Sequence, residues 1–231
     1  MELVESSKIH RSGTFNPGNI CNLACVTCAS SFSTRWQKEL GLPLDRGNPT
    51  QIDPDIIRRA NQMQSIVVGG GEPVLNLSTK TLLSQLNHNV VVSVHFNGTV
   101  MPDKFFLELC AKFNQINFVF SLDGTHKRFE YLRWPGKWNT VAKNITKLIS
   151  EAPDNVGFGV NITRSQLNKH YHQEVVEWAN VEIPFNRKGK STHISYNQAS
   201  PILTQKYLDE LDARRGTNWR AQFPLAVEDI P

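Results

Sequence analysis

Three cysteines lie close together near the beginning of the sequence. Cys21, Cys25 and Cys28 have the spacing C-x3-C-x2-C. A disulfide framework needs cysteines that are spread through an exported chain, whereas clustered thiols are typical of metal sites. Iron–sulfur cubanes are usually held by four thiolates. Three thiolates in one loop can therefore bind three irons of a [4Fe–4S] cluster and leave the fourth iron open to a ligand from outside the protein.

A zinc site is the alternative for the same cysteines. A Cys3His zinc site needs a histidine at ligand spacing, and the nearest histidines in the sequence are His10 and His88. Zinc is therefore the poorer fit. The fourth cysteine, Cys110, lies on the apolar stripe of a predicted helix, where a free cysteine packs as a small hydrophobe. Its alternative role is that of a hydrogen-atom donor.

Alternating strands and helices must position these residues. Short apolar runs predict strands, and longer amphipathic segments predict helices. The expected extended segments are 14–17, 65–68, 90–96, 118–122, 156–162 and 193–196. The expected helices are 33–40, 55–64, 79–87, 103–113, 137–150, 166–180 and 204–214.

This alternation determines the predicted fold class. Strands that are separated by helices imply a parallel sheet with right-handed crossovers. A complete eight-unit barrel takes about 250 residues, so six units in 231 residues predict an incomplete one. We expect an α/β fold, a partial (β/α)6 TIM-like barrel. Residues 1–231 are expected to form a single domain with a short helical tail at about 203–231.

Glycine and polar residues lie at or just after the ends of the predicted strands. Besides the cysteines, these are the run Gly69 to Gly71, Asn97-Gly98, Asp123-Gly124 and Asn161. The carboxyl ends of parallel strands form the edge at which α/β folds bind ligands. The sequence therefore predicts a binding site at this edge.

Composition excludes some partners. The chain carries 25 Lys and Arg against 21 Asp and Glu, a net charge of +4. This mild excess suits an anionic ligand but is too weak to indicate a nucleic-acid partner. No window approaches the roughly 18 apolar residues of a membrane-spanning helix, and the first residues lack the order of a secretion signal. We therefore expect a cytoplasmic protein without a membrane partner.

The motifs, taken in order, resemble the radical SAM superfamily. The C-x3-C-x2-C loop follows the first strand, and Gly70-Gly71-Glu72-Pro73 follows the second as the family's GGEP motif. Asn97-Gly98-Thr99 and Ser121-Leu122-Asp123-Gly124 are similar to its later strand-end elements, and the resemblance extends from Gly13 to Pro224.

Part of the chain resembles twitch-type radical SAM proteins. The similarity lies in Phe129 to Arg133 and in Pro135 to Trp138. Twitch extensions hold auxiliary clusters on further cysteines, and none follows Cys110. The expected number of [4Fe–4S] clusters is therefore one.

The resemblance implies a binding site for S-adenosylmethionine (SAM). Cys21, Cys25 and Cys28 would hold the cluster, whose open iron would take the amino and carboxylate groups of SAM. Gly70 and Gly71 would let the backbone approach the methionyl part closely. Glu72 would accept a hydrogen bond from the amino group.

Further polar residues complete the implied SAM site. Asn97 belongs to this set through its motif, and Ser121 and Asp123 would meet the ribose hydroxyls or the carboxylate. Arg133 would pair with the carboxylate, and Asn161 would meet the ribose or adenine. The alternative is that these Asn, Ser and Asp residues are ordinary turn residues, and that Arg133 forms a surface ion pair. Position 27 is often aromatic in the superfamily but is Thr27 here, so adenine packing would come from elsewhere.

The implied activity is that of an oxygen-sensitive enzyme. A reduced cluster would cleave SAM, and the resulting 5′-deoxyadenosyl radical would abstract hydrogen from a peptide, a protein side chain or a small molecule. The electron would come from an external flavodoxin- or ferredoxin-like donor. Two alternatives remain: an activase for a glycyl-radical enzyme, and a non-catalytic iron–sulfur or zinc binding module.

Overall fold

Six parallel strands form one sheet in the computed structural model, which describes residues 11–45, 51–182, 193–198 and 202–231. The strands pair in chain order from β1 to β6. Together they make a curled half-barrel, which confirms the predicted partial (β/α)6 fold. The strand bounds are Ser12–Phe15 (β1), Ser65–Val68 (β2), Val91–Phe96 (β3), Ile116–Ser121 (β4), Val156–Arg164 (β5) and His193–Gln198 (β6).

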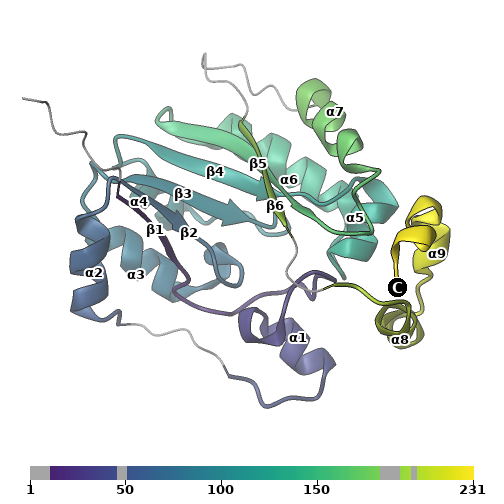
Figure 1. Cartoon of the computed structure of the whole chain (residues 1–231). Coiled ribbons are helices and arrows are strands. Elements are labelled where there is room, and N and C mark those ends of the chain that lie inside the picture. The colour runs from purple at the N-terminus through teal and green to yellow at the C-terminus, as the bar shows by residue number, and fades with distance from the viewer. Residues whose placement is uncertain (1–10, 46–50, 183–192, 199–201) are drawn as a thin grey trace, which may run out of the picture.

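Helices connect the strands and cover the outer face of the sheet (Figure 1). The helices up to β6 are α1 (Thr34–Glu39), α2 (Pro54–Asn61), α3 (Leu77–Gln85), α4 (Lys104–Cys110), α5 (His126–Leu132), α6 (Trp138–Glu151) and α7 (His172–Glu182). Two short 3₁₀ helices, η1 (Ser30–Phe32) and η2 (Pro73–Leu75), follow the cysteines and the glycine run. Among the described residues, no helix has both the length and the apolar character needed to cross a membrane.

Alternation along the strands separates the core from the barrel interior. In β3, Val92, Val94 and Phe96 are buried in the main hydrophobic core between sheet and helices. The residues between them point to the opposite face, because successive strand side chains alternate in direction. Ser93 and His95 therefore face the inside of the half-barrel.

Strand β1 begins two residues before the predicted segment 14–17, α4 ends three residues before the predicted end at residue 113, and two further helices differ more strongly from the sequence prediction. Helix α7 begins at His172 and not at residue 166, because the Asn168 side chain organises a turn before it. Its amide accepts from the Ser165 N–H (2.8 Å) and donates to the Thr163 carbonyl (2.8 Å). Such local bonds compete with helix formation. Helix α5 was not predicted as a helix, although its Phe129 and Leu132 are buried.

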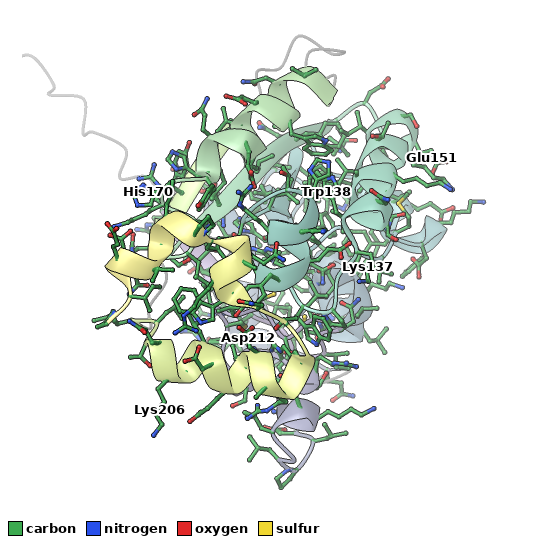
Figure 2. All side chains as sticks on the ribbon, turned by 90° about the vertical axis from the view of Figure 1, so that its right-hand side faces the viewer. Lys137, Trp138, Glu151, His170, Lys206 and Asp212 are labelled. Carbon is green, nitrogen blue, oxygen red and sulfur yellow. The ribbon has the colours of Figure 1, made fainter. Side chains whose placement is uncertain are left out.

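The C-terminal segment is helical and packs as a second hydrophobic cluster. It consists of α8 (Gln205–Arg215), α9 (Trp219–Gln222) and η3 (Pro224–Asp229). Figure 2 shows α8 and α9 side by side, with Lys206 directed away from the molecule and Asp212 between the two helices. The Asp212 carboxylate accepts from the Trp219 N–H (2.7 Å) and fixes α9 on α8. This cluster also contains Ala24, Val26 and Trp36, so it joins the C-terminal helices to the region of the three cysteines.

Candidate functional site

One cavity of about 1060 Å³ lies at the carboxyl ends of the strands. All three clustered cysteines line it, on the segment that we call the cysteine loop (residues 16–28). The run Gly69 to Gly71 and Glu72, which follow β2, line the same cavity. Figure 1 shows α1, α8 and α9 at this end of the molecule. The fold thus brings the cysteine motif and the glycine motif together.

The cysteine loop is hydrogen bonded to the segment after β2. The Gly71 N–H donates to the Gly18 carbonyl (2.9 Å), and the Glu72 N–H donates to the Ile20 carbonyl (2.8 Å). The Asn76 side chain completes this contact, because it donates to the Ile20 carbonyl (2.9 Å) and accepts from the Ile20 N–H (3.1 Å). These bonds fix the position of the loop that carries the thiols.

The close packing of these two segments requires glycine. Gly70 has a φ of +98°, and a Cβ there would lie 2.4 Å from the Gly18 carbonyl oxygen. A Cβ at Gly71 would lie 2.4 Å from the Ile20 carbonyl oxygen and 2.7 Å from the Asn19 carbonyl carbon. The sequence assigned these glycines to close approach of a bound ligand. In the structure, the close approach is between two parts of the chain itself.

The other side of the cysteine loop rests on the end of α5. The Ala24 N–H donates to the Trp134 carbonyl (2.6 Å), and the Val26 N–H donates to the Leu132 carbonyl (2.8 Å). The motif between residues 129 and 138 therefore has a structural role here, because its backbone carbonyls accept hydrogen bonds from the cysteine loop.

Arg215 of α8 binds the cysteine loop to the C-terminal helices. Its Nη2 donates to the Ala24 carbonyl (2.9 Å), and its Nε donates to Glu39 Oε1 (2.8 Å). The guanidinium also lies 4.8 Å from the ring centre of Trp36, at cation–π distance. The Trp36 indole in turn donates to the Cys25 carbonyl (2.9 Å). Only 2% of the Arg215 side chain is exposed, so this buried ion pair is protected from screening.

The three thiols are free and half-buried. Burial raises the pKa of Cys21 to about 12 and raises the pKa values of Cys25 and Cys28 as well. The thiols therefore keep their protons at neutral pH. Because thiolates are the metal-binding form, loading a metal here must release protons.

The arrangement of possible ligands bears on which metal the site could hold. Within the described ranges, no group of three His, Cys, Asp or Glu side chains converges closely enough to hold one metal ion. A zinc ion needs such convergence, because all its ligands share one centre. In a [4Fe–4S] cluster each thiolate binds a different iron. Three cysteines around one cavity are compatible with that arrangement, and His95 lines the same cavity.

Glu72 is buried and held by backbone groups. Its Oε2 accepts from the Asn97 N–H (2.7 Å), and its Oε1 accepts from the Val74 N–H (3.5 Å). Only 1% of the residue is exposed. Burial raises the pKa of Glu72 to about 8, in spite of these two hydrogen bonds. The carboxyl group thus ties the end of β2 to the end of β3.

Asn97 and Ser121 also line the cavity. The Asn97 side chain is engaged within the protein: it donates to Asn22 Oδ1 (2.9 Å) and accepts from the Thr99 N–H (2.9 Å). Ser121 is half-buried at the end of β4, and its hydroxyl has no hydrogen-bond partner in the part of the chain that the structure describes. Ser121 is therefore available to a ligand, whereas Asn97 links the cysteine loop to β3.

The other three predicted residues differ in their access to the cavity. Arg133 lines it and forms a buried ion pair with Asp123 (2.9 Å). Asp123 also accepts from the Thr163 N–H (2.8 Å) and is not among the lining residues. Asn161 is buried, accepts from the Ser195 hydroxyl (3.0 Å) and does not line the cavity either. Asp123 therefore holds Arg133 in place, and Asn161 joins β5 to β6.

The cavity also contains residues that were not predicted as site residues. Among them, His95, Thr163 and Tyr207 line it with polar side chains. Burial lowers the pKa of His95, so its imidazole is neutral at pH 7. The alternation of β3 could have identified His95, since it lies two residues before Asn97. No local pattern predicts Tyr207, whose hydroxyl donates to the Val26 carbonyl (3.3 Å) across 181 residues of sequence.

Cys110 lies away from this site. It is fully buried in the main hydrophobic core, at the end of α4. This agrees with its expected role as a small apolar residue.

Comparison with known proteins finds similar sequences and, separately, solved structures with a similar fold. No protein-family model matches the chain. Mycofactocin maturase MftC of Mycolicibacterium smegmatis is 28% identical over 153 residues, which cover 64% of this chain and 37% of the maturase. MftC of Mycobacterium tuberculosis is 30% identical over 148 residues, which cover 62% of this chain and 36% of that protein. The chain thus spans less than two fifths of the curated relatives it matches.

Solved structures share the fold at lower identity. Streptococcus suis SuiB bound to S-adenosylmethionine has a TM-score of 0.60 and 18% identity, over 90% of this chain and 45% of SuiB. The structure of anSMEcpe with bound AdoMet has a TM-score of 0.58 and 15% identity, over 84% of this chain and 53% of that protein. These likenesses establish a shared half-barrel architecture.

Proposed function

Because this chain belongs to the radical SAM superfamily, we propose that it binds one [4Fe–4S] cluster and SAM and uses them for radical chemistry. The observation that carries the proposal is the common cavity of the three cysteines and the GGEP segment. Both motifs of the family meet there, at the ligand-binding edge of a parallel sheet.

The residues around the cavity would hold the two cofactors. Cys21, Cys25 and Cys28 supply three thiolates, and one iron stays open for SAM. When bound, the reduced cluster supplies one electron that splits SAM into methionine and a radical able to abstract hydrogen from a substrate. The glycine run and Ser121 offer backbone and hydroxyl groups to SAM, and Arg133 adds a fixed positive charge near the thiols.

Glu72, Asp123 and Asn161 act on the site through other residues in this proposal. Glu72 fixes the backbone of Asn97, Asp123 fixes Arg133, and Asn161 accepts from Ser195. Neutral His95 adds an imidazole without bringing a charge into the cavity. The protein's contribution is thus to place the cofactors and to exclude water around them.

We propose a peptide as the substrate. SuiB has been solved with the precursor peptide SuiA, and anSMEcpe with AdoMet and a peptide. The acidic and the basic side chain that line the cavity, Glu72 and Arg133, are both engaged by groups of the chain itself. The cavity therefore suits an uncharged part of the substrate. The electron would come from an external one-electron carrier.

The test is SAM cleavage under anaerobic conditions. The protein is reconstituted with iron and sulfide, reduced with dithionite and incubated with SAM, and 5′-deoxyadenosine is measured. We expect its formation above a zinc-loaded control. A cluster that forms without any cleavage would favour the non-catalytic binding module. The activase alternative would be favoured if SAM is cleaved only when a large partner enzyme is present and a glycyl radical forms on that partner.

A further inference from the structure

Cys21 lies between two cavities. On one side is the main cavity, and on the other is a surface hollow of about 450 Å³ that Cys21 also lines. We call this second cavity the basic hollow; its other lining residues are Ile20, Thr34, Arg35, Lys38 and Leu44. Thr34 holds Cys21 at this position, because its hydroxyl accepts from the Cys21 N–H (3.2 Å). Cys21 thus borders both the main cavity and the basic hollow.

The basic hollow carries positive charge that the described chain does not neutralise. Arg35 and Lys38 lie on α1, and neither side chain forms an ion pair or hydrogen bond with another described residue. The acidic residue of the same helix, Glu39, is engaged by Arg215. The two cations are therefore available to an anionic partner.

Exposed leucines follow these cations along the chain, and one of them lines the basic hollow. Leu44 lines it and is 47% exposed, and Leu42 is 45% exposed. Apolar side chains beside unpaired charges are typical of protein–protein contact surfaces, where the charges steer association and the apolar groups are buried. A small inorganic anion would use the charges but not the leucines. The surface therefore fits an acidic protein.

A hollow on the far side of the loop has a different charge pattern. It has about 200 Å³ and is lined by Cys28, Glu210 and Arg214 among others. Glu210 and Arg214 bring both signs of charge to that surface. Charge alone thus distinguishes the Cys21 side as the one that attracts an anionic partner.

We propose that the basic hollow is the docking site of an acidic one-electron carrier protein, and that the electron enters the cluster site past Cys21. This inference rests on the proposed function. The carrier is oxidised by one electron and the cluster is reduced by one, so no bond or proton is exchanged. Within these 231 residues, the only other cysteine, Cys110, is buried in the core. The described part of this chain thus offers no second exposed cysteine as a relay, and the basic hollow lies directly against the cysteine loop.

The test uses a flavodoxin as the carrier and the double variant Arg35→Glu with Lys38→Glu. Affinity for flavodoxin is measured by calorimetry at low and high salt, on protein with and without the cluster. Reduction of the cluster is followed by stopped-flow absorbance, once with flavodoxin hydroquinone and once with dithionite. We expect the double variant to lose about tenfold or more in affinity at low salt. Reduction by flavodoxin should slow in parallel, and reduction by dithionite should stay as in the unmodified protein.

A control variant makes the same change of charge elsewhere. Lys104→Glu with Lys112→Glu alters two exposed lysines at α4, on the outer side of the barrel. The milder double variant Arg35→Gln with Lys38→Gln should give an intermediate loss of affinity for flavodoxin. It keeps the proposal testable if the first variant does not fold. Unchanged flavodoxin affinity in both Arg35/Lys38 variants, or an equal loss in the control, would overturn the docking proposal. Failure of the unmodified protein to cleave SAM with dithionite would instead count against the proposed function, because the binding measurement does not depend on it.

Discussion

Replacing Cys25 with alanine is expected to abolish both cluster loading and SAM cleavage. Mutation of an outer partner of a metal ligand costs roughly 10–100-fold in metal affinity, and Cys25 would be a direct ligand. The two remaining thiols cannot hold three irons. The loss of affinity for the cluster should therefore exceed this range of roughly 10–100-fold. Little iron or sulfide should remain bound after reconstitution. The 5′-deoxyadenosine signal should disappear.

The matched control is Cys110→Ala, which removes a thiol from the core. Cys110 is fully buried away from the cavity, so this variant should bind as much iron as the unmodified protein. Its stability should fall by about 1 kcal/mol, as for an ordinary small core substitution. If Cys25→Ala loads iron like Cys110→Ala, the cysteine loop is not the cluster site.

Replacing Gly71 with alanine should separate the cysteine loop from the segment after β2. The added Cβ would lie 2.4 Å from a backbone oxygen, that of Ile20, which cannot rotate away as a side chain can. Overpacking against well-packed groups costs typically about 1–3 kcal/mol, and we expect the upper end of that range. The hydrogen bonds from Gly71 and Glu72 to the loop would be lost with it. Urea unfolding measures the stability, and equilibrium dialysis of the reconstituted protein measures SAM affinity.

Gly69→Ala is the control within the same glycine run. A Cβ at Gly69 would approach only the Asn16 side-chain oxygen, at 3.2 Å, and that side chain can turn away. Its cost should stay within about 1 kcal/mol, with SAM binding retained. Equal behaviour of the two variants would show that contact with the cysteine loop is not the reason for glycine at position 71.

Much of the fold and part of the site could be predicted from the sequence. Six strands separated by helices implied a parallel sheet, and parallel strands place their following loops at one edge. That rule alone predicts that the cysteine loop, the glycine run and Asn97 approach one another. The structure brings them to a single cavity.

Contacts that depend on tertiary packing could not be predicted. Arg215 reaches the Ala24 carbonyl across 191 residues of sequence, and no local pattern in α8 predicts such a contact. Residue type also could not reveal which polar groups are already engaged. Asp123 follows β4 and Asn161 lies within β5, and their side chains bind Arg133 and Ser195. The sequence predicts the glycine run as a ligand contact, whereas its packing against Gly18 and Ile20 depends on the tertiary fold.

Electron paramagnetic resonance of the reduced protein, recorded before and after SAM is added, tests the central claim most directly. The claim is that three cysteines hold a [4Fe–4S] cluster with one iron open to SAM. We expect the signal of one reduced cluster per chain, and a clear change in that signal when SAM binds the open iron. A cluster whose signal SAM leaves unchanged, or a protein that binds zinc and no cluster, would contradict the account.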